Sequence, residues 1–294
     1  MAQKEFLVSM NQKAAENPEF WEAVKLLQRE APVVSVLGKD PGAVATERAK
    51  TARAWLVAGG DGTLHHAVNS LMELPPDERC PLWYLPFGTG NDFARTLNLG
   101  EIAPLELITR ALKSEGACRE MAVGRCNERY FLNMASGGLF ATITPDTNPQ
   151  LKSVAGRWSY LISGIGKLLE RETIATQVDA QAAEPLLGFF LGNAKFAGGG
   201  IQIAADASPF RNELEFLTVP DMPAPQLLAL GLELQKDAPD LTGYPVQKRS
   251  VKELTLRFDR ETPINLDGEQ VNVREAAFTL FPAAVKVFVP ANAG

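Results

Sequence analysis

The sequence predicts an α/β domain followed by a domain that consists mainly of β-strands. In the first third of the chain, short apolar runs alternate with segments of helical periodicity, which is typical of βαβ units around a parallel sheet. Two of these apolar runs end in glycine-rich loops. From Cys118 onward the chain changes to short strands joined by turns, which predicts the β-rich second domain.

The elements of the first domain follow from local patterns. The apolar residues 6–10 predict a strand, and Asn17 followed by Pro18 predicts the start of a helix that continues to Glu30. Further apolar runs and helical repeats complete the domain: we expect strands at 33–37, 54–58 and 82–85, and helices at 43–53 and from 104 to about 114.

The second domain is expected to contain two helices among its strands. The helix at 151–171 carries an apolar stripe, which either packs against the β domain or rests on lipid headgroups. The other helix is expected at 224–235. Period-two and apolar runs predict the strands, which we place at 119–124, 129–134, 185–192, 213–219, 251–258 and 263–266.

Composition restricts the partners and the compartment. A net charge of −6 argues against nucleic acid as a partner and requires any contact with an anionic membrane to be local. The chain shows neither a signal-peptide pattern at its start nor a run of roughly 18 apolar residues that could span a membrane. Without such a run the protein can at most lie on a bilayer. Its three cysteines lack the spacing of a metal site or a disulfide framework, so we expect a cytoplasmic protein.

The first glycine-rich loop, Gly59-Gly60-Asp61-Gly62-Thr63, lies between a buried-type strand and a helix. Glycine has no Cβ, so a phosphate can approach the backbone N–H groups at the positive end of the helix. The alternative is a tight turn without a ligand.

The second loop, Gly88-Thr89-Gly90-Asn91-Asp92, also follows a strand. Ligands of open α/β sheets bind at the carboxyl ends of the strands, so both loops are candidates for one site. Thr89 can offer its hydroxyl to a nucleotide, whereas Asn91 and Asp92 can equally be a helix N-cap.

At these two loops the chain resembles the diacylglycerol kinase catalytic-domain superfamily, which pairs a GGDGT loop with a GTxNDFA loop. The segments 132–139, 192–200 and 265–269 continue the match in order, and together they resemble the YegS-like bacterial lipid kinases over nearly the whole chain. The resemblance implies a nucleotide-binding α/β domain like those of NAD kinases and phosphofructokinases, followed by a β-sandwich domain, with the active site between them. We place the first domain at 1–117, with the segment 284–294 as a candidate completion, and the second at 118–283.

The implied activity is an ATP-dependent lipid kinase. It would transfer the γ-phosphoryl group to the hydroxyl of a diacylglycerol-like or phosphatidylglycerol-like lipid, at a bilayer surface, with Mg²⁺ or alternatively Ca²⁺ as the cation. The protein would then be peripheral to the membrane, and a monomer and a homodimer both remain open. The alternatives are an enzyme like NAD kinase, because GGDGT is shared with it, and a nucleotide-binding protein that has lost turnover.

The resemblance also assigns site residues. Glu269 would accept the proton of the attacking hydroxyl, with Asp267 and Asp61 as rival acidic groups; by itself, the turn that holds Asp267 and Glu269 can be a simple hairpin. The nucleotide would be bound by residues of the two loops, namely Gly59, Gly60, Asp61, Gly62, Thr63, Leu64, His65, His66, Thr89, Asn91 and Asp92.

Three departures from the family pattern bear on this assignment. His65 and His66 follow Leu64 where family members usually have other residues, so they are either phosphate contacts or exposed residues of a helix surface. Leu37 stands where a threonine commonly contacts the nucleotide.

The third departure concerns a structural Mg²⁺ that the family typically binds at an Asp-Gly turn, largely through backbone carbonyls. The corresponding residues here are Ser208, Arg211 and Glu213, and Arg211 replaces the aspartate. An arginine beside a cation site opposes metal binding, so we expect this ion not to be held as the family holds it.

Overall fold

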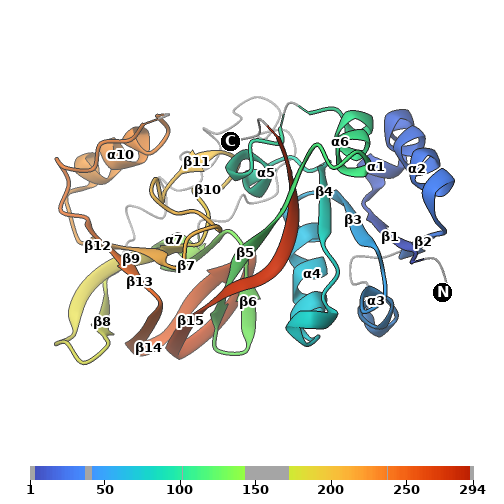
Figure 1. The fold of residues 1–294 in the computed structure, drawn as a ribbon. Helices are drawn as coiled ribbons and strands as arrows, with labels where there is room; N and C mark the ends of the chain where they lie inside the picture. The colour runs from blue at the N-terminus through green and yellow to red at the C-terminus, as the bar shows by residue number, and fades with distance from the viewer. Residues whose placement is uncertain (1–3, 37–41, 101, 143–171, 237, 292–294) are drawn as a thin grey trace. The chain divides into compact units, whose positions relative to one another are not determined.

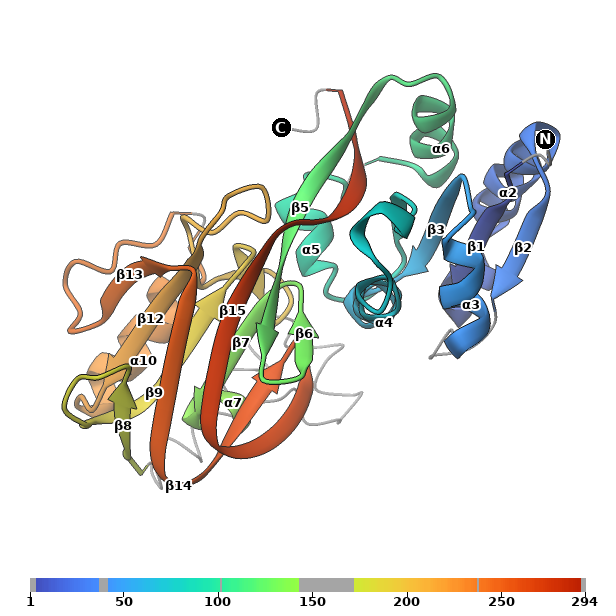
Figure 2. The same ribbon diagram turned by 60° about the horizontal axis from the view of Figure 1, so that its bottom comes forward.

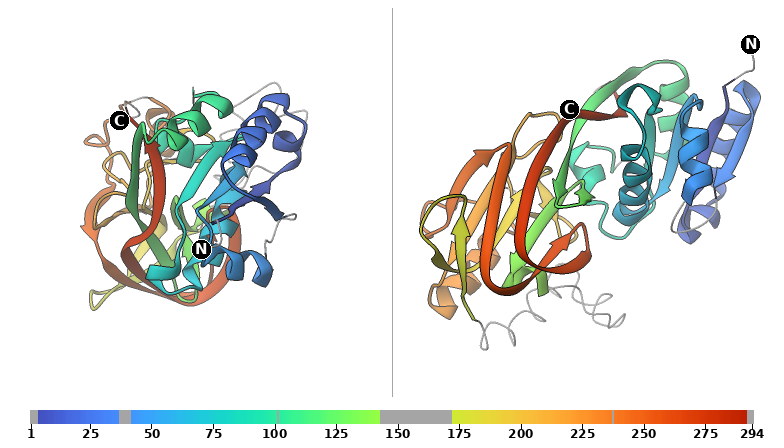
Figure 3. Two further views of the ribbon diagram at one scale, coloured as in Figure 1. Left: turned by 45° about the vertical axis from the view of Figure 1, so that its right-hand side comes forward. Right: turned by 90° about the horizontal axis from the view of Figure 1, so that it is seen from below.

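The computed structural model describes residues 4–36, 42–100, 102–142, 172–236 and 238–291. The chain forms two compact units. The first comprises Met1–Val123 and Pro282–Gly294, and the second comprises Gly124–Phe281. Two long strands, β5 (Gly116–Cys126) and β15 (Glu269–Pro290), contribute residues to both units and pair with each other (Figure 3).

The first unit is built on a parallel sheet. Its strand order is β2 (Val33–Val36), β1 (Phe6–Met10), β3 (Ala54–Gly59) and β4 (Leu82–Pro86), and Val287 of β15 continues the sheet beyond β4. All six residues of β3 are buried, as expected for a central strand that is covered on both faces.

Helices cover both faces of this sheet. The helix α2 (Pro18–Glu30) packs with α6 (Pro104–Leu112) on one face, and α3 (Gly42–Ala49) packs with α4 (Asp61–Met72) on the other (Figure 1). The side chain of Asn17 caps α2 by accepting a hydrogen bond from the backbone N–H of Phe20 at 3.1 Å. Shorter elements connect the strands: α1 (Gln12–Ala15), η1 (Pro76–Glu78) and α5 (Asp92–Thr96).

The second unit is built on an antiparallel sheet. Its central strands follow the order β13 (Gln247–Val251), β12 (Leu214–Pro220), β9 (Glu184–Gly192), β7 (Met134–Gly138), β14 (Glu253–Leu266) and β15. The described residues of this unit also form β6 (Arg129–Phe131), β8 (Ile174–Val178), β10 (Phe196–Ala197), β11 (Ile201–Gln202), α7 (Leu139–Thr142) and α10 (Ala224–Glu233).

This sheet curves around an aromatic core. The ring of Phe189 on β9 lies 6.0 Å from that of Phe278 on β15, although β7 and β14 separate these strands in the sheet. Figure 2 shows the strong bend of β14 and β15 that allows this contact. The facing layers therefore come from one folded sheet. On the other side of β9 and β12, Leu227 and Leu230 of α10 complete a second apolar cluster.

Most expected elements of the first unit are present, and the larger differences are in the second. The strand expected at 129–134 is interrupted, because the backbone N–H groups of Leu132 and Asn133 bind the carboxylate of Asp267 instead of a neighbouring strand. Of the two strands expected at 251–258 and 263–266, residues 253–258 and 263–266 belong to the single strand β14, whereas Val251 ends β13. Leu37 and the helix expected at 151–171 lie outside the described residues. None of the helices in the described part of the chain is long and apolar enough to cross a membrane.

Candidate functional site

Three loops meet at the carboxyl edge of the parallel sheet. The side-chain amide of Asn11, directly after β1, donates to the carbonyl of Phe87 at 3.1 Å, and its backbone N–H donates to Ala58 at 2.9 Å. The backbone N–H of Phe87 donates to Gly59 at 2.8 Å. The strand order reverses between β1 and β3, which is the position where open α/β sheets bind ligands. The two glycine loops therefore share one edge, as predicted, and the loop after β1 joins them.

The glycines of these loops have different roles. A Cβ atom on Gly60 would lie 2.9 Å from the Cα atom of Gly88, and one on Gly88 would lie 2.5 Å from the Cα atom of Gly60, so the two backbones touch. A Cβ atom on Gly59 would collide with the side chain of Thr63. At Gly62 a Cβ atom would meet nothing within 4 Å. Of these four glycines, only Gly62 has open space at the position that a side chain would occupy.

Asp61 fastens the second loop to the first. Its carboxylate accepts hydrogen bonds from the backbone N–H groups of Asp92 at 3.1 Å and Phe93 at 3.0 Å, which begin α5. Hydrogen bonds to a charged group contribute about 1.5–3 kcal/mol each. The carboxylate of Asp61, rather than a side chain of the second loop, therefore caps α5.

Asn91 braces the second loop internally. It occupies the N-cap position of α5 in the left-handed conformation, with φ of 52°, but its side chain does not cap that helix. Instead, Oδ1 accepts from the backbone N–H of Gly88 at 2.8 Å and Nδ2 donates to the Gly88 carbonyl at 3.1 Å. Asp92 is buried. Asn91 thus occupies the N-cap position, as one interpretation predicted, but its side chain does not form the hydrogen bond of an N-cap.

The helix α4 presents its N-terminus at this edge. Its N-cap residue is Gly60, which has no side chain to bind the first-turn N–H groups. These groups and the helix dipole make the position favourable for an anion. Leu64 and His65 are buried, so the interpretation of His65 as an exposed residue is wrong, whereas His66 and Thr63 are partly exposed.

Lys13 adds a cation that was not predicted from the sequence. It follows β1, and its Nζ atom donates to Oγ1 of Thr89 at 3.1 Å; both side chains are exposed. The available signal was weak: the segment Asn11-Gln12-Lys13 is a polar stretch after the first apolar strand, at the same sheet edge as the glycine loops.

Tyr84 lies on β4 beneath the loops. Burial raises the pKa of its phenol well above the usual value, and the negative charges of Asp61 and Asp92 raise it further. The phenol therefore stays neutral at physiological pH and adds no charge next to Asp61 and Asp92.

The second unit contains the other two acidic candidates. Asp267 and Gly268, with φ of 52° and 102°, form the two-residue turn between β14 and β15. The carboxylate of Asp267 accepts hydrogen bonds from three consecutive backbone N–H groups, those of Leu132, Asn133 and Met134. Asp267 therefore anchors a distant segment to the hairpin.

Glu269 has a different environment. Its side chain is 46% exposed, and a carboxylate oxygen lies 3.6 Å from a guanidinium nitrogen of Arg129 on β6. Asp61 and Asp267 are bonded to backbone N–H groups, whereas the ion pair of Glu269 is a surface contact that contributes little. Of the three acidic candidates, Glu269 has the carboxylate that is most accessible to a substrate.

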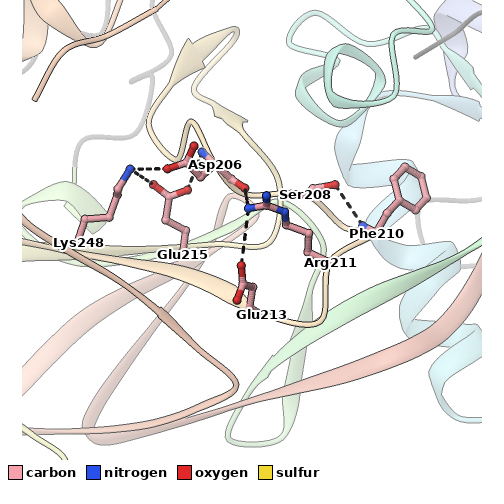
Figure 4. A network of polar contacts seen from close by, with 7 residues as sticks. All are labelled: Asp206, Ser208, Phe210, Arg211, Glu213, Glu215 and Lys248. Carbon is pink, nitrogen blue, oxygen red and sulfur yellow. Dashed lines mark hydrogen bonds and ion pairs between the residues drawn. The ribbon is translucent and has the colours of Figure 1, made fainter.

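The residues that correspond to the family's structural cation site take part in a network of hydrogen bonds and ion pairs (Figure 4). The guanidinium of Arg211 donates to the carbonyl of Asp206 at 3.1 Å and lies 3.6 Å from a carboxylate oxygen of Glu213. The carbonyl of Ser208 accepts the backbone N–H of Arg211 at 2.9 Å. Among the described residues, no group of three or more His, Cys, Asp or Glu side chains is arranged to hold a metal ion. At this loop the guanidinium of Arg211 therefore lies beside the carbonyl of Asp206 and the carboxylate of Glu213.

Lys248 completes this network. Its Nζ atom lies 2.5 Å from Oδ2 of Asp206 and 3.7 Å from Oε1 of Glu215. The hydrogen bond from Lys248 lowers the pKa of Asp206 and the same bond raises the pKa of Lys248, whereas burial raises the pKa of Glu215. The buried carboxylate of Glu215 thus depends on Lys248 for its counter-charge.

Comparisons with known proteins agree with this architecture. Residues 5–126 match the family model described as the diacylglycerol kinase catalytic domain. Proteins named "Probable lipid kinase YegS-like" from Yersinia pestis (strain Pestoides F) and Yersinia pseudotuberculosis serotype O:3 are each 32% identical over 300 residues, covering 97% of both chains. A crystal structure of a diacylglycerol kinase from Bacillus anthracis strain Sterne matches 100% of this chain and 99% of its own, with a TM-score of 0.78 and 20% identity.

Proposed function

Because the chain belongs to the YegS-like lipid kinase family, phosphotransferases that act on an alcohol group, we propose that it transfers the γ-phosphoryl group of ATP to the free hydroxyl of a diacylglycerol-like or phosphatidylglycerol-like lipid. The observation that carries the proposal is the meeting of three strand-end loops at the start of α4, which supports a site for a triphosphate in the first unit.

The triphosphate is assigned to the first turn of α4. The uncapped N–H groups after Gly60 and the open space beside Gly62 support contact between the backbone and phosphate oxygens. A larger residue at Gly62 would occupy that space. Asp61 contributes by holding the second loop in place, so its role is positioning.

Lys13 and Thr89 are assigned to the phosphates as well. The ammonium group of Lys13 has no carboxylate partner among the described contacts and donates to the hydroxyl of Thr89. A phosphate oxygen is a stronger acceptor for an ammonium group than a hydroxyl is. We therefore expect Lys13 to move from Thr89 to the triphosphate when the nucleotide binds, and Thr89 to become available as a second donor.

Glu269 is assigned as the proton acceptor. In the proposed reaction the lipid hydroxyl oxygen attacks the γ-phosphorus, the bond from that phosphorus to the β–γ bridging oxygen breaks, ADP leaves, and the hydroxyl proton passes to the carboxylate. The accessibility of Glu269 supports this role, and the backbone bonds of Asp61 and Asp267 argue against either as the base. Mg²⁺ enters bound to ATP, as part of the substrate, and neutralises charge on the phosphates.

The proposal is tested with labelled ATP, Mg²⁺ and mixed micelles of diacylglycerol or phosphatidylglycerol, with NAD in a parallel reaction. Glu269→Gln should lower kcat by about 10² to 10⁴, the usual contribution of a general base, with little change in ATP affinity. Lys13→Gln should instead raise the KM for ATP.

Glu275→Gln is the matched control, because Glu275 lies on the same strand, is 54% exposed and is also paired with an arginine. Equal activity of the Glu269 and Glu275 variants would remove Glu269 from the mechanism. Phosphorylation of NAD alone would move the enzyme to the NAD kinase type, and ATP binding without any product would indicate lost turnover.

A further inference from the structure

The loop that leads into β12 is bridged by the side-chain cation of Arg211. Arg211 lies at the turn, and its guanidinium spans from the backbone carbonyl of Asp206 to the carboxylate of Glu213, at 3.1 and 3.6 Å (Figure 4). A backbone carbonyl and a carboxylate are the oxygen ligands that Ca²⁺ and Mg²⁺ select. Arg211 thus contacts the kinds of oxygen that would otherwise surround a divalent cation.

A second cation reaches the same loop from the adjacent strand. Lys248 on β13 contacts Oδ2 of Asp206 and lies 3.7 Å from Oε1 of Glu215, whose side chain is 6% exposed. The other carboxylate oxygen of Glu215 accepts the backbone N–H of Asp206 at 2.8 Å. Lys248 and Glu215 therefore hold the beginning of the loop, as Arg211 holds its end.

The charge balance of the loop is consistent with two side-chain cations, Arg211 and Lys248, in place of one divalent ion. A divalent ion would bring a charge of +2 to this loop, and Arg211 and Lys248 together bring the same charge to the carboxylates of Asp206, Glu213 and Glu215. We infer that in this chain the loop 206–215 is held by Arg211 and Lys248 in place of a bound divalent cation, so that its stability does not depend on Mg²⁺ or Ca²⁺.

The competing possibility is that Arg211, which is 56% exposed, swings away and admits a cation. Two observations oppose it. The carbonyl of Ser208 is already bonded to the backbone N–H of Arg211 within the turn, and Lys248 would still repel a cation beside Asp206.

The first test uses the unmodified protein without nucleotide. Its thermal unfolding midpoint is measured in EDTA and in millimolar Mg²⁺ or Ca²⁺, and its metal content is determined after purification without chelator. A ligand present at about 100 times its Kd raises the midpoint of a chain of this size by several degrees. We expect the same midpoint in all buffers and no bound metal. A midpoint that falls in EDTA, or one tightly bound ion per chain, would overturn the inference.

The second test is Arg211→Asp, which removes the built-in cation and supplies a carboxylate next to the same oxygens, whose negative charge offsets the repulsion of a cation by Lys248. Its midpoint should fall in EDTA and recover in a saturable way as Ca²⁺ or Mg²⁺ is added. Arg257→Asp is the control, because Arg257 is similarly exposed and is paired with Glu275 in the same unit. Its midpoint should be indifferent to cations.

An Arg211→Asp protein that ignores cations, or an equal response of both variants, would contradict the inference. If Arg211→Asp does not fold, Arg211→Gln decides: its midpoint should fall below that of the unmodified protein by the same amount with and without cations. A larger loss in EDTA would show that a metal still binds.

Discussion

Replacing Gly62 with alanine separates the proposed ligand role of the glycine loop from its structural role. Gly62 is the second residue of α4, and a Cβ atom there meets no protein atom within 4 Å. In a helix, alanine is favoured over glycine by about 0.5–1 kcal/mol, with the lower end expected near the terminus. The free protein should therefore be slightly more stable, with an unfolding midpoint higher by roughly 1–2 °C.

Nucleotide binding should change in the opposite direction. If a phosphate lies over the first turn of α4, the added methyl group enters its space, and we expect the Kd for ATP to rise by at least about tenfold, equivalent to about 1.4 kcal/mol. Both quantities can be measured on one preparation, by thermal unfolding without ligand and by calorimetric titration with MgATP.

A variant that is more stable and binds ATP normally would refute the placement of the phosphates over Gly62. Gly60→Ala is the contrasting variant, because its Cβ atom would collide with the backbone of Gly88. It should lose stability by about 1–3 kcal/mol, the usual range for overpacking, together with binding. Loss of ATP binding in Gly60→Ala would therefore not distinguish a blocked phosphate site from a damaged loop. Gly62→Ala makes this distinction, because it is expected to weaken ATP binding without lowering the stability of the free protein.

Two further predictions concern carboxylates that bind the backbone or lie buried. Asp267→Asn should destabilise the protein by about 2–4 kcal/mol in denaturant unfolding, because the charge that holds three backbone N–H groups is lost; a change no larger than that of Glu269→Gln would contradict its anchoring role. Lys248→Met should cause a loss of stability that is larger near pH 8 than near pH 5. Burial raises the pKa of Glu215, so the stability it contributes is present below its unfolded pKa and lost as pH rises through the folded value, and removal of Lys248 enlarges that loss. Lys248 also lowers the pKa of Asp206, whose contribution is present at both of these pH values and is lost only on stronger acidification, so this part of the loss is the same near pH 5 and near pH 8. A pH-independent difference between the two proteins would contradict this account.

The first unit was largely predictable because its signals are local. The central strand of a parallel sheet is buried on both faces and appears as a continuous apolar run, as in Ala54–Gly59. The Asn17-Pro18 pair marks the start of α2 by capping and by a fixed φ angle. The shared edge of the two glycine loops follows from parallel strand order alone.

The contacts that were missed connect distant segments. Lys13 and Thr89 are 76 residues apart, and Asp267 and Leu132 are 135 apart, so no periodicity or spacing marks either pair. The length of β15 was also missed, because charged residues such as Arg274 and Lys286 interrupt its apolar pattern. These long-range contacts and the length of β15 depend on how whole strands pack together, and local sequence patterns do not contain that information.

The acidic residues of the motifs illustrate why residue type does not identify a role. Asp61 and Asp267 are both carboxylates in loops of family-like sequence, yet each binds backbone N–H groups of another segment. Substitution of either would abolish activity by releasing that segment, and an activity assay alone would then count it as catalytic. Glu269 can be distinguished from them because, within the part of the chain that the structure describes, its carboxylate pairs with Arg129 and binds no backbone N–H group. A loss of kcat at unchanged stability is therefore the measurement that separates a proton acceptor from an anchor in this chain.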